Sequence, residues 1–206
     1  MRAHKLVTDR IGAFSDGVIA VIITVMVLDL KAPEAVTWAA LWPLWPTLIS
    51  YAVSYLFIAI VWINHHHLLQ FAQRATPRLI WTNFAHLFAV SLVPLVTSWV
   101  ARTHLATAPV ATYAAIFVCV NLAYRLFETE MLKQASSACM CPRMRRMARR
   151  RSLATIIMFA LAMLVALMAP LAGLGLICGA LFLCLRPEAP GSGRVYWRKH
   201  SVASLK

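Results

Sequence analysis

The sequence predicts an all-α, polytopic membrane protein with six transmembrane helices in each subunit. Of its 206 residues, 61% are hydrophobic and 13% are charged, and the mean hydropathy is +0.72. A soluble domain is about 45–50% apolar and about 25% charged. A membrane span needs about 20 apolar residues, and runs of this kind recur along the whole chain. The expected spans are Ile11–Leu30, Leu48–Leu69, Leu79–Val100, Val110–Leu132, Leu153–Ala169 and Leu171–Leu185.

These spans divide the chain into three parts. Residues 1–10 form a cytoplasmic N-terminus, residues 11–186 a six-helix transmembrane domain, and residues 187–206 a flexible basic cytoplasmic tail. Pro94 falls inside the third span and should kink it, because proline removes one backbone donor. The last two spans are short and meet at Pro170, so we expect them to form a tight helical hairpin.

The basic residues fix the expected orientation. The formal charge of +13 falls mainly in the N-terminus, residues 70–78, residues 133–152 and the C-terminus, whereas the opposite loops hold only Lys31 and Arg102. This is the positive-inside pattern of a cell-membrane protein with both termini in the cytoplasm. It favours a topology signal over a nucleic-acid surface, with anionic lipid at the basic loop as an added partner. The loop's arginines are Arg143, Arg145, Arg146, Arg149, Arg150 and Arg151.

Other function classes find little support in the sequence. The five cysteines form no pattern typical of disulfides or of a metal site. In Asn64-His65-His66-His67 the imidazoles are adjacent, whereas a metal site needs two on one helix face. No set of Ser, His and Asp lies at one depth, and no cofactor motif occurs. We therefore expect no metal, no cofactor and no enzymatic activity.

The first span has two distinct faces. At 100° per residue, Leu28 lies about 20° from Val21, Val25 about 40° and Thr24 about 60°, and Phe14 and Gly17 share this side. Asp16 lies about 140° away from Val21, nearly opposite. If the apolar stripe lines a passage, Asp16 must therefore point back into the protein.

Partners for Asp16 can be sought by depth. Six residues, or about 9 Å, separate it from Arg10, and two other spans bring polar side chains to this level of the inner leaflet. A structural clamp is one interpretation, supported by the i,i+4 spacing of Trp62 and His66 on one face. A proton relay through Asp16 and histidine is the alternative, because an ionisable group in a membrane marks a pathway or a pairing. The candidate partners are Trp62, Asn64, His65 and His66 in the second span and Trp81, Asn83 and His86 in the third.

The motif Arg10-x-x-x-Phe14-Ser15-Asp16, with the apolar run that follows it, resembles the signature of the transmembrane protein 175 family of potassium channels. Trp62-x-Asn64-His65-His66, the six spans and the basic inner loop resemble its prokaryotic members. The resemblance implies a homotetramer in which the first helix of each subunit lines a central pore that conducts K+ ions. It also implies a hydrophobic constriction at Val21, Val25 and Leu28, and a contribution of Thr24 to selectivity.

This sequence departs from the family pattern at one position, the narrowest point of the expected constriction. Isoleucine or leucine is usual there, and Val21 is shorter, so the neck is expected to be wider or easier to wet. The chain also lacks the Thr-Val-Gly-Tyr-Gly carbonyl filter of ordinary potassium channels. The leading hypothesis is thus a potassium-preferring cation channel. The alternatives are a proton-coupled transporter using Asp16 with His65, His66 or His86, and a scaffold that binds a soluble partner through Arg143–Arg151.

Overall fold

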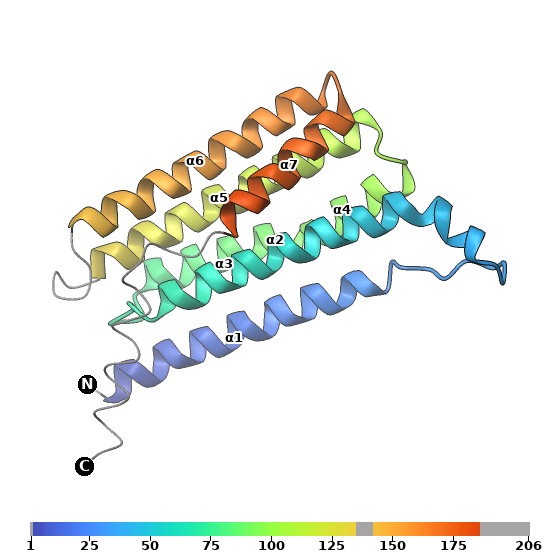
Figure 1. Cartoon of the computed structure of the whole chain (residues 1–206). Helices are drawn as coiled ribbons and strands as arrows, with labels where there is room; N and C mark the ends of the chain where they lie inside the picture. The colour runs from blue at the N-terminus through green and yellow to red at the C-terminus, as the bar shows by residue number, and fades with distance from the viewer. Residues whose placement is uncertain (1, 135–141, 186–206) are drawn as a thin grey trace, which may run out of the picture.

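The computed structural model describes residues 2–134 and 142–185, which form seven α-helices and one 3-10 helix. The helices run along a common direction and give an elongated bundle (Figure 1). The expected all-helical fold is confirmed. The elements are α1 (Arg2–Val27), η1 (Trp38–Leu44), α2 (Trp45–Leu69), α3 (Pro77–Ser91), α4 (Val93–Arg102), α5 (Thr107–Gln134), α6 (Pro142–Ala166) and α7 (Pro170–Cys184).

Four segments are long and apolar enough to cross a membrane. They are Thr8–Val27, Trp38–Leu69, Pro77–Arg102 and Thr107–Gln134, with mean hydropathies of 1.6–1.8. The α7 helix is apolar but has only 15 residues, and α6 begins with a basic stretch before its apolar part. The membrane location is therefore established by the first four segments, and a crossing by the last two helices stays a prediction.

Two helices begin earlier than the hydropathy predicted. The α1 helix begins at Arg2 rather than Ile11, and α6 begins at Pro142 rather than Leu153. Arg143–Arg151 therefore lie on the first turns of α6, and the expectation that they belong to a loop is wrong. Hydropathy marks where apolar residues begin, whereas Arg, Lys, Ala and Met continue a helix readily beyond that point. The expected tail at residues 187–206, with Cys139 and Cys141, lies outside the described residues.

The third span is interrupted where its proline predicted. The α3 helix ends at Ser91 and α4 begins at Val93, with Pro94 in the first turn of α4. The ring of Pro94 conflicts with the carbonyl of Val90, and its nitrogen has no hydrogen to donate. The connection after α4 contains His104 and Leu105 with φ of 48° and 62°. Leu105 is nevertheless 3% exposed, so burial of its side chain holds this left-handed turn in place.

The α6–α7 hairpin is tight, as expected. Gly173 lies so close to α6 that a Cβ atom there would be 2.5 Å from the Cβ of Ala166. At the other end of the hairpin, the guanidinium of Arg151 donates a 2.9 Å hydrogen bond to the carbonyl of Cys184. That carbonyl is in the last turn of α7, where helix carbonyls lack intrahelical partners and attract positive charge.

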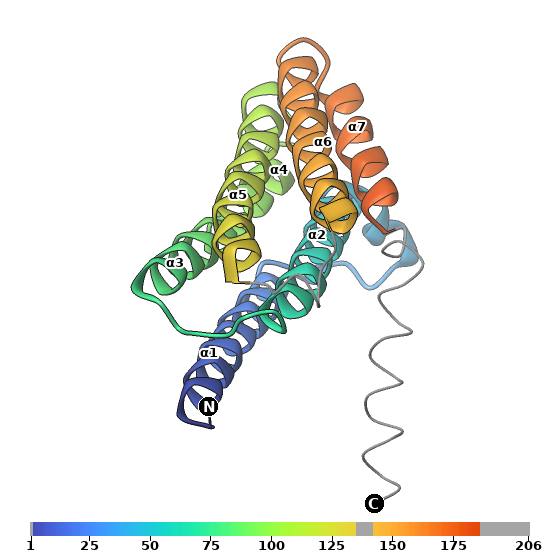
Figure 2. The same cartoon turned by 90° about the vertical axis from the view of Figure 1, so that its left-hand side faces the viewer.

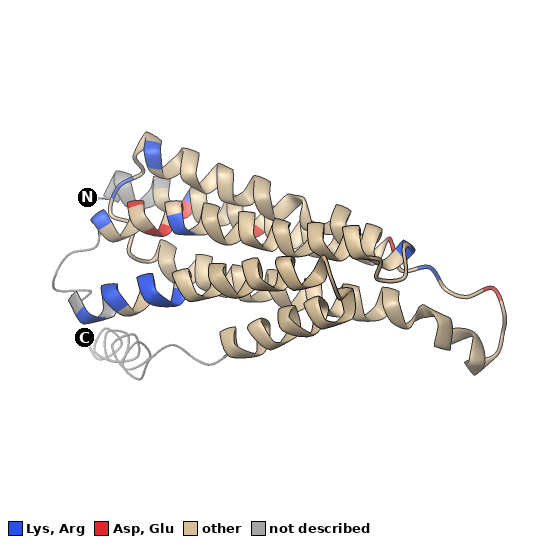
Figure 3. Ribbon diagram, turned by 90° about the horizontal axis from the view of Figure 1, so that it is seen from above, with Lys and Arg blue, Asp and Glu red and all other residues tan. Residues whose placement is uncertain are grey.

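The packing leaves α1 at the edge of the bundle. It contacts α2 and α3 along one side, while α5, α6 and α7 pack together on the other side of the molecule (Figures 1 and 2). The apolar core lies between these groups, where Phe57 of α2 stacks on Phe117 of α5 with ring centroids 3.7 Å apart. Lys and Arg gather at the end of the bundle where α1 and α6 begin (Figure 3). One face of α1 is thus left without a partner in the part of the chain that the structure describes.

Candidate functional site

The two faces of α1 differ sharply in exposure. Ser15, Ile19, Ile22 and Met26 are buried against α2 and α3, with exposed fractions of 0–7%. Val21 is 58% exposed, Val25 45% and Leu28 76%, and Phe14, Gly17 and Thr24 are exposed as well. We call the exposed set Phe14, Gly17, Val21, Thr24, Val25 and Leu28 the α1 stripe.

Thr24 is the residue of the α1 stripe that has a polar side chain. Its hydroxyl donates a 2.9 Å hydrogen bond to the carbonyl of Val21, one turn earlier in the same helix. A threonine hydroxyl has one hydrogen and two lone pairs. Because the hydrogen is used within the helix, the lone pairs of the exposed oxygen are available to an electropositive partner such as a cation.

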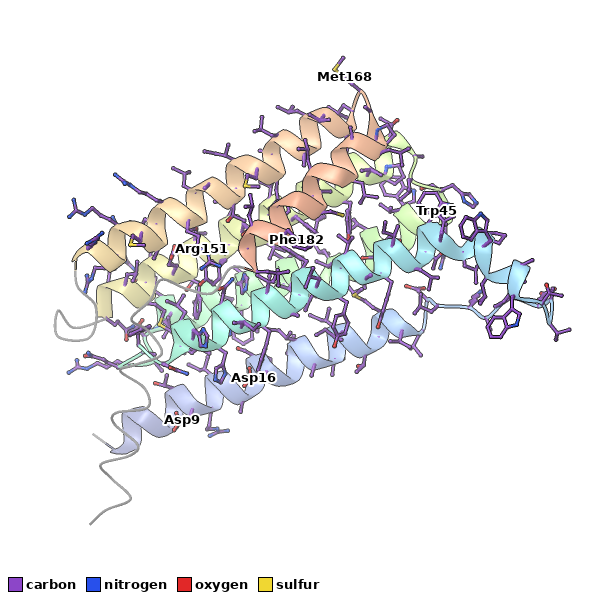
Figure 4. All side chains as sticks on the ribbon, viewed as in Figure 1. Asp9, Asp16, Trp45, Arg151, Met168 and Phe182 are labelled. Atoms are coloured by element: carbon purple, nitrogen blue, oxygen red, sulfur yellow. The ribbon has the colours of Figure 1, made fainter. Side chains whose placement is uncertain are left out.

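Asp16 lies on the side of α1 that faces α2 (Figure 4). Its Oδ1 accepts a 2.8 Å hydrogen bond from the indole Nε1 of Trp62. Its Oδ2 is 4.0 Å from Nδ1 of His66, and the rings of Trp62 and His66 are 5.4 Å apart. We call Asp16, Trp62 and His66 the outer contact, because the side chains of Asp16 and His66 are 39% and 47% exposed.

A second set of contacts is fully buried beneath the first. The Nδ2 of Asn83 donates to Ser15 Oγ at 3.0 Å, and Asn83 Oδ1 lies 2.7 Å from Nε2 of His65. Ser15 also donates to the carbonyl of Ile11 at 2.9 Å. Asn83 thus joins α1, α2 and α3 through one side chain. We call Ser15, His65 and Asn83 the inner contact; each of the three is at most 2% exposed.

His86 lies next to the inner contact without joining it. Its ring is parallel to that of His65, with centroids 5.7 Å apart, and it also faces Tyr124 and Phe127. Neither ring nitrogen of His86 has a hydrogen-bond partner among the described residues. His65 and His86, which the sequence placed at one depth, are therefore neighbours in the structure. The described contacts link neither of them directly to Asp16.

Other residues singled out in the sequence lie apart from these contacts. Arg10 is exposed near the start of the membrane segment. Phe14 packs edge-on against Phe84 of α3, at 5.6 Å between ring centroids. Asn64 points into a cavity on the far side of α2, and Trp81 is 73% exposed. These residues miss the outer and inner contacts because residues at one depth can point in opposite directions, depending on their position around the helix.

One polar cluster was missed by the sequence analysis. Ser54 Oγ lies 2.6 Å from Thr97 Oγ1 and 2.5 Å from the hydroxyl of Tyr113, so α2, α4 and α5 meet there. All three side chains are buried. The sequence did contain a signal for this cluster, because three spans carry a hydroxyl residue at one depth. The depth comparison started from the ionisable Asp16 and therefore did not include these uncharged residues. The cluster ties α2, α4 and α5 together, as hydroxyls do between membrane helices.

The described part of the chain contains no group of three or more His, Cys, Asp or Glu that could hold a metal ion. The fold and the site together define a helical membrane protein whose first helix is fastened by polar contacts on one side and presents an apolar stripe on the other.

The comparisons with known proteins show what the first part of the chain is similar to. Residues 10–94 match the family described as "Endosomal/lysosomal potassium channel TMEM175". Proteins named as potassium channels are 42% identical over 124 residues in Chryseobacterium sp. (strain P1-3) and 36% over 127 residues in Streptomyces collinus. These matches cover 60% and 56% of this chain, and 65% and 60% of the relatives. The matched part thus spans less than two thirds of each relative's length.

The fold agrees with that of a solved structure. The crystal structure described as a lysosomal potassium-selective channel TMEM175 homolog from Chamaesiphon minutus superposes with a TM-score of 0.77. It is 24% identical in sequence, and the match covers 88% of this chain and 98% of that one. Residues 10–94 are therefore similar to the TMEM175 family, as the resemblance of the first span indicated. The matching relatives are named as channels and not as enzymes.

Proposed function

We propose that this chain is one subunit of a potassium-preferring cation channel in the cell membrane. Four copies would surround a central pore, with α1 of each copy facing the axis and six segments of each copy crossing the bilayer. The family and the names of its members as potassium channels support ion conduction. The observation that carries the pore assignment is the α1 stripe, an exposed face on a helix whose opposite face is buried.

The polar contacts explain why this face is held in one direction. The outer and inner contacts attach the back of α1 to both α2 and α3. A helix held by two neighbours at one level cannot rotate about its axis without breaking both. The role of Asp16 is then to hold the helix, and the residues on the other face meet the ion.

The α1 stripe supports a hydrophobic neck rather than a carbonyl filter. Four copies of Val21, Val25 and Leu28 would form successive apolar rings, which gate a pore by excluding water. Thr24 would place four hydroxyl oxygens between the rings of Val21 and Val25. These oxygens can replace part of the hydration shell of a passing cation. Val21 is shorter than isoleucine or leucine, so its ring admits water at lower cost.

The charge distribution supports an orientation with both chain ends in the cytoplasm. The basic residues at the start of α6 lie at the same end of the bundle as the beginning of α1 (Figure 3). Trp45 lies at the opposite end (Figure 4), and Trp38 and Trp42 belong to η1, which directly precedes it. An aromatic belt would meet the outer head groups there. The arrangement follows the positive-inside rule.

The proton-relay alternative receives less support from the contacts. A relay needs a continuous chain of hydrogen bonds from Asp16 through the histidines. The described contacts of Asp16 instead end at His66, which is partly exposed. The inner contact joins His65 to Asn83 and does not include Asp16. A relay would predict proton flux that Asp16→Asn abolishes while the protein still folds.

The test is ion flux in liposomes that contain the purified protein, under separate K+, Na+ and proton gradients. We expect K+ flux to exceed Na+ flux, and Val21→Ala to increase conductance or reduce selectivity because four methyl-bearing side chains are shortened together. Val27→Ala is the matched control, since Val27 is 47% exposed and lies about 120° from Val21 around the helix. Equal effects of the two variants would contradict the pore assignment, and absence of cation flux would contradict the channel.

A further inference from the structure

A cavity of about 260 Å³ lies between α2, α5, α6 and α7, away from the α1 stripe. Its volume is just below the roughly 300–1,000 Å³ typical of sites for small organic ligands. It is separated from the outer and inner contacts, because α2 lies between them. The pore and its polar contacts therefore make no use of this space.

The cavity changes character with depth. Its deep end is lined by Phe57, Val120, Phe159 and Leu181, which are all buried apolar residues. Glu128, Arg151 and Ser152 line its other half, and Phe71, Leu132 and Met147 lie about one turn beyond them. Val120 precedes Glu128 by just over two helical turns, which is about 12 Å along α5. A ligand that matches both ends must be amphipathic, with its apolar part directed toward the middle of the membrane.

Glu128 is an unusual residue for this position. It is 4% exposed, and its Oε2 is buried with no hydrogen-bond partner among the described residues. A buried oxygen that lacks a donor is costly and calls for a water, an ion or a ligand. The terminal torsion of a glutamate is broad, so its carboxylate can turn to meet a donor that enters from the cavity.

The surroundings of Glu128 limit the charge of that donor. Arg125 and Arg149 act electrostatically on its carboxylate, and Ser152 interacts with it. Arg151 uses one of its hydrogens on the carbonyl of Cys184 and lines the cavity. A simple cation would be repelled by three arginines, and a simple anion by the glutamate. A zwitterion with an ammonium and a phosphate satisfies both signs.

We propose that this cavity binds an inner-leaflet phospholipid whose head group carries a primary ammonium, the chemistry of phosphatidylethanolamine. The ammonium donates to Glu128, the phosphate accepts from Arg151, and part of one acyl chain occupies the deep end. The proposal rests on the membrane orientation proposed above and is independent of ion conduction. Arg125 of α5 donates to the carbonyl of Arg149, so the basic start of α6 lies level with the part of α5 that carries Arg125. In that orientation, we place this level at the depth of the head groups.

The test is native mass spectrometry of the purified full chain, titrated with phosphatidylethanolamine, phosphatidylcholine and phosphatidylglycerol of identical acyl chains. Choline differs in having no N–H donor. We expect phosphatidylethanolamine to bind about tenfold more tightly than phosphatidylcholine, and Glu128→Gln to bring this ratio close to one. Glu130→Gln is the matched control, because Glu130 lies on the same helix and pairs with Lys133 instead of lining the cavity.

A second variant covers the case in which Glu128→Gln fails to fold. Ala148→Leu adds bulk to the cavity wall, and should weaken phosphatidylethanolamine binding severalfold without affecting ion flux. Equal affinity for the ethanolamine and choline lipids, or a preference that survives in Glu128→Gln, would overturn the proposal. So would phosphatidylglycerol binding as tightly as phosphatidylethanolamine. Displacement of the lipid by free phosphoethanolamine at similar concentrations would also overturn the proposal, because it would show that the acyl chain does not contribute to binding. Each of these outcomes leaves the flux result unaffected.

Discussion

Replacing Asn83 with leucine tests how strongly the inner contact fastens α1 to the bundle. The substitution keeps the approximate volume of the side chain and removes its amide. Two contacts between helices are lost, one to Ser15 and one to His65. Ser15 keeps its bond to the carbonyl of Ile11, whereas His65 is left without a partner, because its Nδ1 already lacks one among the described residues.

The expected cost follows from these losses. Hydrogen bonds between membrane helices contribute about 0.6 kcal/mol each on average, and a buried polar group that loses its partner costs about 1–3 kcal/mol. Together they predict that Asn83→Leu lowers the free energy of unfolding by about 2–4 kcal/mol. For a chain of this size, each kcal/mol shifts the melting temperature by about 2–4 °C, so we expect a decrease of roughly 4–16 °C.

The assay is thermal unfolding of the purified protein in detergent, followed by size-exclusion chromatography of the fraction that stays folded. Asn121→Leu is the control, because the amide of Asn121 donates only to Phe117 in its own helix. We expect the control to change the melting temperature by much less than Asn83→Leu. If the two variants are equally stable, Asn83 does not fasten α1, and the fixed direction of the α1 stripe loses its explanation.

Two further predictions concern the backbone. Gly173→Ala should destabilise the α6–α7 hairpin by about 1–3 kcal/mol, because the new Cβ would lie 2.5 Å from Ala166. Gly175→Ala, where nothing lies within 4 Å, should instead stabilise α7 by up to about 1 kcal/mol; equal effects in a melting experiment would contradict the close approach of the two helices. His104→Gly should raise the melting temperature, since a left-handed residue with a side chain costs about 1–2 kcal/mol and His104 has φ of 48°. A lower melting temperature would show that the imidazole itself stabilises the turn.

The positions of single residues show where sequence reasoning works and where it fails. Helical periodicity placed Val21 and Asp16 on different faces of α1, and the structure has them there because both lie in one continuous helix. Counting residues for depth placed Asn64 beside Asp16, and it lies on the far side of α2 instead. Depth along one helix is set by its own rise per residue, whereas direction toward another helix depends on how the two are rotated against each other.

The sequence by itself determined the membrane setting, the helical fold, the resemblance to the TMEM175 family and the two-faced character of α1, because each depends on composition, on a local period or on a short motif. It did not determine that Arg143–Arg151 would lie on α6, because polarity marks the membrane boundary and leaves the end of the helix open. Only the tertiary structure decided that Asp16 pairs with Trp62 while Ser15 and His65 meet at Asn83. It alone also placed Glu128 in the wall of a cavity built by four helices. Contacts of this kind depend on the relative rotation of packed helices, which many side chains fix together and no single segment encodes.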